Sequence, residues 1–338
     1  MSFKCGIVGL PNVGKSTLFN ALTNSSKAQA GNFPFCTIDP NVGVVPVPDN
    51  RLKNLAKISN SKKIINTTIS FVDIAGLVKG ASKGEGLGNK FLSHIREVDA
   101  IIHMIRCFDS DDIQNVNPNV DPIRDLEIIE TEMMLADLES IQKRLEKNNK
   151  KTLEDEQLKI LETTLDYINN DKDILNLKSK FEKKQINQCG LLSLKPKIFV
   201  CNVDEKSIRN GNNYTKAFID KFGKENTLVV SADIENQINE LEISEKKNYM
   251  EMIGLKETGL DILIQKGYKI LELDTYFTIY FRIYPTFILN KILVRNCFSS
   301  DKTFFKISMN FPSSFWRGTI FLYSPSPGFF QAWCKKSI

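Results

Sequence analysis

The sequence predicts an α/β fold built on a mainly parallel sheet, and two observations support that prediction. Over residues 1–125, short apolar runs alternate with segments of helical periodicity, which is the pattern of consecutive βα units. Six apolar runs also have the length and composition of strands. These runs are Cys5–Leu10, Val42–Val47, Ile69–Asp73, Ala100–Arg106, Lys197–Cys201 and Thr227–Val230.

A segment of different character separates the fourth predicted strand from the fifth. Residues 126–194 are rich in Glu, Lys, Leu and Ile, and Met134, Leu138 and Ile141 follow one another at spacings of four and three. This periodicity predicts a helical hairpin inserted into an α/β domain that comprises residues 1–125 and 195–272. Its many charges are interpreted as solvated helix faces.

The composition changes again in the C-terminal segment, residues 273–338. Residues 279–338 contain ten of the 22 phenylalanines, eight Lys or Arg and a single acid, Asp301, a local charge of +7. The rest of the chain carries 37 basic and 39 acidic side chains, or −2. The sequence pI of 8.6 therefore reflects this segment alone, and we expect no specific DNA partner.

Several classes of protein are disfavoured by composition. No apolar run has the length needed to span a bilayer, and Met1–Lys4 lead directly into a predicted strand, so neither a membrane partner nor a signal peptide is expected. The seven cysteines lack metal-ligand spacing. We therefore expect reduced thiols and a cytoplasmic protein.

A phosphate-binding loop is the strongest motif. Gly9–Ser16 fits G-x-x-x-x-G-K-[ST], follows an apolar strand and opens a predicted helix. Glycines let backbone N–H groups converge on phosphate oxygens, and the helix N-terminus adds partial positive charge. Lys15 is expected to reach the β- and γ-phosphates as a catalytic group, and the Ser16 hydroxyl to bind Mg²⁺.

Two further segments complete the expected Mg²⁺ and γ-phosphate site of a GTPase-like P-loop NTPase. Asp73 and Gly76, in Asp-Ile-Ala-Gly, end a second apolar strand about 60 residues after the loop. Asp73 is expected to hold Mg²⁺ and the Gly76 N–H to face the γ-phosphate. Thr37 lies where a switch threonine would complete the metal shell. A lone loop threonine is more often only a turn residue, so this assignment depends on the other two motifs.

The base-recognition segment departs from that of guanine-specific proteins. Those proteins end a strand with [NT]-K-x-D, whose aspartate accepts from guanine N1–H and N2–H. Here the strand delivers Asn202-Val203-Asp-Glu205, and Ser231-Ala232 closes the next strand. The altered donors and acceptors predict a weakened guanine preference, although spacing alone does not predict adenine.

The hydrolytic machinery is also altered. Leu77 stands where Ras-like GTPases carry the glutamine that orients water, so intrinsic hydrolysis is expected to be slow. Water would then be positioned by the backbone, by K⁺ or by a residue from elsewhere. His94, which follows the glycine-rich Lys83–Gly88, is a catalytic candidate, and an ordinary helix-surface histidine is the favoured interpretation.

Together these residues resemble the Obg-like ATPase (YchF) family of translation-associated P-loop proteins, over about residues 1–278. The resemblance implies an enzyme that hydrolyses ATP in preference to GTP and binds ribosomes, with the large subunit as the expected partner. It also implies that the helical insertion is a coiled coil and that a TGS domain of β-grasp type follows. Implied contacts with nucleotide are Asn12, Val13, Gly14, Lys15, Ser16, Thr17 and Val203, and implied contacts with Mg²⁺ are Ser16 and Thr37.

The segment after Thr278 departs from that family, because the expected glycine-containing loop and Arg-Ala-Trp-Thr strand are missing. One hypothesis is that residues 279–338 derive from a shifted reading frame, a retained intron or a wrong gene model. Two alternatives to the ATPase function stay open: an Obg-class GTPase, and a nucleotide-regulated binding module with negligible turnover.

Overall fold

All elements named below lie within the residues that the computed structural model describes: 3–29, 42–47, 49–59, 61, 63–74, 87–110, 119–147, 154–170, 172–273, 275–283, 287–299, 302–309, 318–323 and 331–336. Two compact units are present. The first comprises residues 1–47 and 67–271, and the second comprises residues 48–66 and 272–338.

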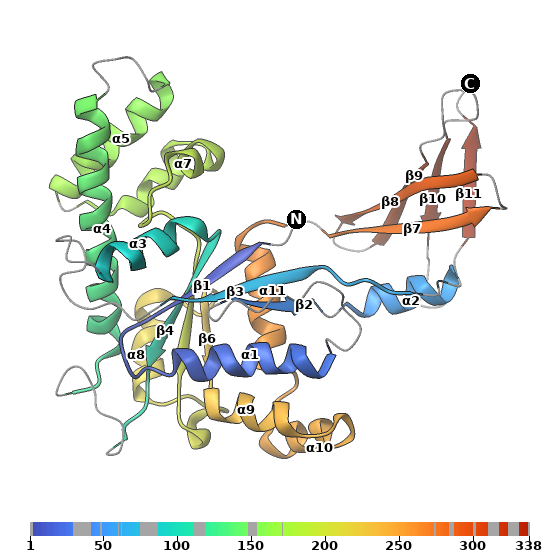
Figure 1. Cartoon of the computed structure of the whole chain (residues 1–338), viewed down its shortest axis with the longest axis horizontal. Coiled ribbons are helices and arrows are strands. Elements are labelled where there is room, and N and C mark those ends of the chain that lie inside the picture. Colours follow the sequence, from blue (N-terminus) through green and yellow to red (C-terminus); the bar gives the residue numbers. More distant parts are fainter. Residues whose placement is uncertain are drawn as a thin grey trace. The chain divides into compact units, whose positions relative to one another are not determined.

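A six-stranded sheet of order β2-β3-β1-β4-β5-β6 forms the centre of the first unit (Figure 1). Its strands are β1 (Lys4–Val8), β2 (Val42–Pro46), β3 (Thr68–Asp73), β4 (Ala100–Arg106), β5 (Lys197–Asn202) and β6 (Thr227–Val230). β2 runs antiparallel to β3, and the other neighbouring strands are parallel. The predicted α/β fold with a mainly parallel sheet is thus confirmed, as are all six strands, with small shifts at some ends.

Helices complete the first unit around this sheet. They include α1 (Lys15–Gln29), α3 (Leu87–Glu97), α8 (Asn213–Phe222), α9 (Ala232–Glu240), α10 (Ile243–Ile253) and α11 (Gly259–Ile270). α1 packs against β2, β3 and α9, while α11 packs against β5 and β6. Every residue of β4 is buried, so its sequence is apolar on both faces, apart from the buried His103 and Arg106, instead of alternating between apolar and polar residues.

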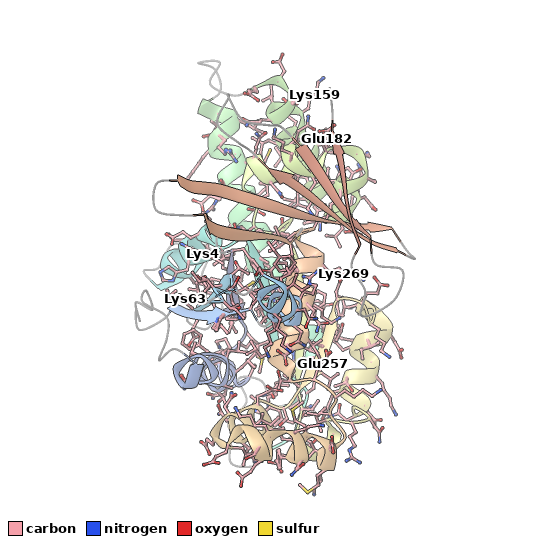
Figure 2. All side chains as sticks on the ribbon, turned by 90° about the vertical axis from the view of Figure 1, so that its right-hand side faces the viewer. Lys4, Lys63, Lys159, Glu182, Glu257 and Lys269 are labelled. Atoms are coloured by element: carbon pink, nitrogen blue, oxygen red, sulfur yellow. The ribbon has the colours of Figure 1, made fainter. Side chains whose placement is uncertain are left out.

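The described part of the segment between β4 and β5 is largely helical, as predicted, and its first helix begins at Pro122, four residues before the predicted start at residue 126. It contains α4 (Pro122–Lys147), α5 (Asp155–Asn169), α6 (Leu177–Lys180), α7 (Lys183–Cys189) and a 3₁₀ helix (Ile174–Asn176). Buried apolar side chains, among them Ile141, Ile160 and Leu177, form its own core. Charged side chains such as Lys159 and Glu182 lie exposed on its outside (Figure 2). Its description as a coiled coil stays a prediction.

The second unit contains a five-stranded antiparallel sheet of order β11-β10-β9-β8-β7. Its elements are α2 (Asn50–Ile58), β7 (Tyr276–Ile283), β8 (Phe287–Ser299), β9 (Lys302–Met309), β10 (Gly318–Tyr323) and β11 (Gln331–Lys336). The Arg51 guanidinium lies 5.1 Å from the centre of the Phe277 ring. Consecutive strands pair with each other as a simple meander, and the β-grasp fold implied for this segment stays a prediction.

Two expectations from composition concern membranes and thiols. No helix in the described part of the chain combines the length and the apolar character that a membrane span requires. The cysteines whose side chains are described are buried and form no disulfide bonds: Cys5, Cys107, Cys189 and Cys201.

Candidate functional site

The loop between β1 and α1 follows a path that only glycine permits at two positions. A Cβ added at Gly9 would lie 2.5 Å from the backbone oxygen of Met104 on β4, which cannot move away without disturbing the sheet. Gly14 has a φ of 95°, in the region that L side chains rarely adopt. Asn12 between them also has a positive φ, 62°. The loop is therefore shaped as the phosphate-binding motif requires.

Lys15 is the first residue of α1, and its ammonium group is buried at the base of this loop. Its Nζ donates a hydrogen bond to the backbone oxygen of Leu10 at 2.7 Å. Burial lowers the pKa of Lys15 from 10.5 to about 8, and the nearby Asp73 carboxylate opposes that shift. A polyanion bound to the loop would stabilise the protonated form of Lys15, since a nearby opposite charge favours the charged form of an amine.

Ser16 and Asp73 come together at the carboxyl ends of β1 and β3. The Ser16 Oγ donates to the Asp73 Oδ2 at 3.2 Å. The other carboxylate oxygen of Asp73, Oδ1, is buried and has no hydrogen-bond partner among the described residues. A hydroxyl and an unpaired carboxylate oxygen are ligands that Mg²⁺ prefers, so these residues fit the ion that the motif implies.

The described residues do not supply a complete metal cage. They contain no cluster of three or more His, Cys, Asp or Glu side chains arranged to hold a metal ion. Mg²⁺ in nucleotide sites is held by one or two protein ligands together with phosphates and water, which suits the Ser16–Asp73 pair. Thr37, Gly76 and Leu77, predicted for this site, lie outside the described residues.

Asn202 ends β5 and joins the predicted base-recognition segment to the phosphate loop. Its Nδ2 donates to the backbone oxygen of Val13 at 3.0 Å, and its Oδ1 accepts from the backbone N–H of Ala232 at 3.0 Å. The side chain is buried. Asn202 therefore fixes the phosphate loop and the turn before α9 relative to each other, whatever contact it makes with a nucleotide.

The remaining base-site residues differ in what they can offer. The Ser231 Oγ is fully buried and has no hydrogen-bond partner in the part of the chain that the structure describes. The Val203 side chain lies in a core cluster with Phe218, so only its backbone is available to a nucleotide. Glu205 is exposed at the start of a short 3₁₀ helix (Glu205–Ser207).

His94 is exposed in the last turn of α3. In a parallel sheet, each helix returns from the carboxyl edge of the strands to the amino edge, and α3 leads into the start of β4 at Ala100. His94 therefore lies on the part of α3 that is farther from the phosphate loop. This placement favours the interpretation of His94 as a helix-surface residue.

Two groups that bear on this site carry no signal in the sequence. The Leu10 carbonyl is a backbone group, and no motif marks it as the acceptor for Lys15. Gln237 on α9 donates from Nε2 to the Glu205 Oε1 at 2.7 Å, although the two residues are 32 positions apart in the sequence. Its position on an exposed helix face gives no signal in a single sequence.

The strand–loop–helix arrangement, with Lys15 and Ser16 facing Asp73 and Asn202 securing the loop, defines a P-loop NTPase of the GTPase-like class. A family model described as "50S ribosome-binding GTPase" matches residues 4–135. Proteins named ribosome-binding ATPase YchF are similar over most of the chain. The one from Haemophilus ducreyi is 50% identical over 286 residues, and the one from Bacillus subtilis 46% over 288, each alignment covering 82% of this chain and 78% of the relative.

A solved structure agrees with these relatives. The structure of the Schizosaccharomyces pombe YchF GTPase matches with a TM-score of 0.69 and 35% identity, covering 81% of this chain and 77% of that one. The chain belongs to the YchF family.

Proposed function

We propose that the chain binds a nucleoside triphosphate with Mg²⁺ on the loop Gly9–Ser16 and hydrolyses it to the diphosphate and phosphate, with ATP preferred over GTP. The contact between Ser16 Oγ and Asp73 Oδ2 carries this proposal, because it leaves the buried Asp73 Oδ1 unpaired beside the phosphate loop. Relatives of this chain bear the name ATPase, which supports ATP as the substrate.

Each residue has a defined part in the proposed reaction. The N–H groups at the start of α1 and the Lys15 ammonium bind the phosphates, and Lys15 offsets the charge that develops on the β–γ bridging oxygen. Ser16 and Asp73 would hold Mg²⁺, which neutralises phosphate charge when bound, and Thr37 is proposed to complete the Mg²⁺ shell. Gly76 is proposed to donate its N–H to the γ-phosphate. K⁺ is a further proposed ion for positioning the attacking water.

Base selection is proposed to come from Asn202, the Val203 backbone, Glu205, Ser231 and Ala232. Replacement of the guanine-reading aspartate by Glu205 supports weaker binding of GTP. The unpaired hydroxyl of Ser231 is a candidate donor to the bound nucleoside.

The rate of hydrolysis is proposed to be low, because Leu77 stands in place of the glutamine that orients water in Ras-like GTPases. The enzyme is therefore proposed to act as a slow nucleotide switch.

The ribosome is the proposed partner, with contacts to the large subunit. The names of the relatives and the description of the matching family model support this, and they make the cytoplasm the proposed compartment. The helical segment, as a coiled-coil arm, and residues 273–338, in the position of a TGS domain, are the proposed contact regions.

Phosphate release at steady state tests the reaction. The full chain with ATP and Mg²⁺ should release phosphate slowly, faster with ribosomes, and not at all in EDTA or in the Lys15→Ala variant. Tight, Lys15-dependent ATP binding without any release, even with ribosomes, would instead establish a binding module with negligible turnover.

A further inference from the structure

A chain of two side-chain hydrogen bonds ends on the carboxylate of Glu205. The Gln237 Nε2 on α9 donates to the Glu205 Oε1 at 2.7 Å. The Tyr249 hydroxyl on α10 donates to the Oε1 of the same Gln237 amide. Because a carboxylate only accepts, the Gln237 NH₂ must face Glu205, and its carbonyl oxygen is then free to accept from Tyr249. The two bonds are therefore mutually consistent in their donors and acceptors.

The same helix holds both ends of the segment 202–205. Asn202 accepts from the backbone N–H of Ala232 in the first turn of α9, and Glu205 accepts from Gln237 five residues further along. Five residues of helix span about 7.5 Å, so the segment is held along α9 instead of at one point. Gln237 therefore fixes the direction of the Glu205 side chain relative to the base site that Asn202 borders.

This tether changes what Glu205 can accept from a base. A guanine presents two adjacent donors, N1–H and N2–H. To accept from both, a carboxylate must place its two oxygens in the plane of the base. In this chain one oxygen already accepts from Gln237, and the carboxylate is drawn toward α9. An adenine presents no such donor pair, so its binding loses nothing by the tether.

We propose that Gln237, oriented by Tyr249, is a positioning residue for nucleotide specificity that holds Glu205 away from the guanine edge and so disfavours GTP. The inference rests on the proposed binding of nucleotide to the P-loop and assigns a cause to its base preference. It concerns the ratio of the affinities for ATP and GTP, and not the rate of hydrolysis.

The test measures dissociation constants for Mg²⁺-ATP and Mg²⁺-GTP on the full chain. In Gln237→Leu the GTP affinity should rise about fivefold relative to ATP, the size expected for one net hydrogen bond. Tyr249→Phe, which keeps the ring, should shift the ratio in the same direction by less. If Gln237→Leu fails to fold, Gln237→Ser removes the same amide with a polar side chain.

A matched control exists on α11. There the Gln265 Nε2 donates to the exposed Glu257 Oε2 at 3.1 Å, another glutamine–glutamate pair on the surface, with Glu257 marked in Figure 2. Gln265→Leu removes the same kind of bond and should leave the ATP:GTP ratio at its wild-type value.

Two outcomes would overturn the inference. One is an unchanged ratio in folded Gln237→Leu whose ATP binding is intact. The other is an equal shift when Gln237→Leu is made in a Glu205→Ala background, since the effect must pass through Glu205. These outcomes can be distinguished from failure of the proposed function itself, because in that case the wild-type chain would bind neither ATP nor GTP.

Discussion

The Asn202 side-chain amide donates a hydrogen bond to the backbone oxygen of Val13 at 3.0 Å, which joins the end of β5 to the phosphate loop. The same side chain accepts from the backbone N–H of Ala232, so one buried residue connects three segments of the site. This arrangement makes the shape of the phosphate loop depend on a residue 189 positions away in the sequence.

Replacing Asn202 with alanine should damage both stability and binding. The change leaves the Val13 carbonyl and the Ala232 N–H without their partner, and we expect a loss of about 2–3 kcal/mol in the free energy of unfolding. Urea unfolding checks this, and a titration with ATP should show weaker binding. Asn239→Ala is a matched control, because that amide donates to the backbone oxygen of Ala21, away from the loop. It should leave the ATP affinity unchanged.

Gly9→Ala should abolish nucleotide binding. The new methyl group would lie 2.5 Å from the Met104 backbone oxygen, closer than real Cβ contacts allow, so the loop must leave its position. Gly190→Ala is the control, since its φ is 64° and nothing lies within 4 Å of the added atom. That variant should cost about 1 kcal/mol for the positive φ alone and bind ATP normally. Normal ATP binding by Gly9→Ala would show that the loop does not form the site.

The affinity for ATP should fall as pH rises above about 8. Burial lowers the pKa of Lys15 from 10.5 to about 8, and phosphate binding favours its protonated form. Above pH 8 binding must therefore take up a proton, and the affinity should approach a tenfold loss per pH unit. Calorimetric titrations from pH 7 to about pH 9.5, in buffers of different ionisation enthalpy, would measure that uptake. A flat profile with no proton uptake would contradict this role for Lys15.

Glu235 should make the protein less stable as pH rises from 4.5 to about 6. This carboxyl is buried under the start of α11, where it accepts from the Gly259 N–H at 2.7 Å, and burial raises its pKa from 4.5 to about 6. The folded state thus binds the proton more tightly than the unfolded state, so stability is lost through this window. Denaturant unfolding across pH 4 to about 7 should show a shallower decline for Glu235→Gln than for the wild type. Equal slopes would contradict the assignment.

Much of the first unit was predictable because its chemistry restricts the residue types. The P-loop requires glycines, a lysine and a hydroxyl in fixed order, and the buried strands require largely apolar runs, so both appear directly in the sequence. The predicted end of the first strand was wrong by two residues, since β1 ends at Val8. Gly9 and Leu10 continue no ladder with β3 or β4, and the Leu10 carbonyl instead accepts from Lys15.

Contacts between distant surface positions were not predictable. Gln237 and Glu205 meet because α9 packs beside the end of β5, and neither residue type is unusual for an exposed position. The antiparallel direction of β2 was also absent from the prediction, because the apolar pattern of Val42–Pro46 is the same for either direction of pairing. Such features depend on how the elements pack, which a periodicity in one sequence does not contain.

The most direct test of the central claim is a competition titration of the full chain with ATP and GTP in the presence of Mg²⁺, alongside Lys15→Ala. We predict that ATP displaces a bound fluorescent nucleotide at lower concentration than GTP, and that Lys15→Ala binds neither. Tighter binding of GTP than ATP would contradict the proposed base preference, and nucleotide binding that survives Lys15→Ala would contradict the proposed site.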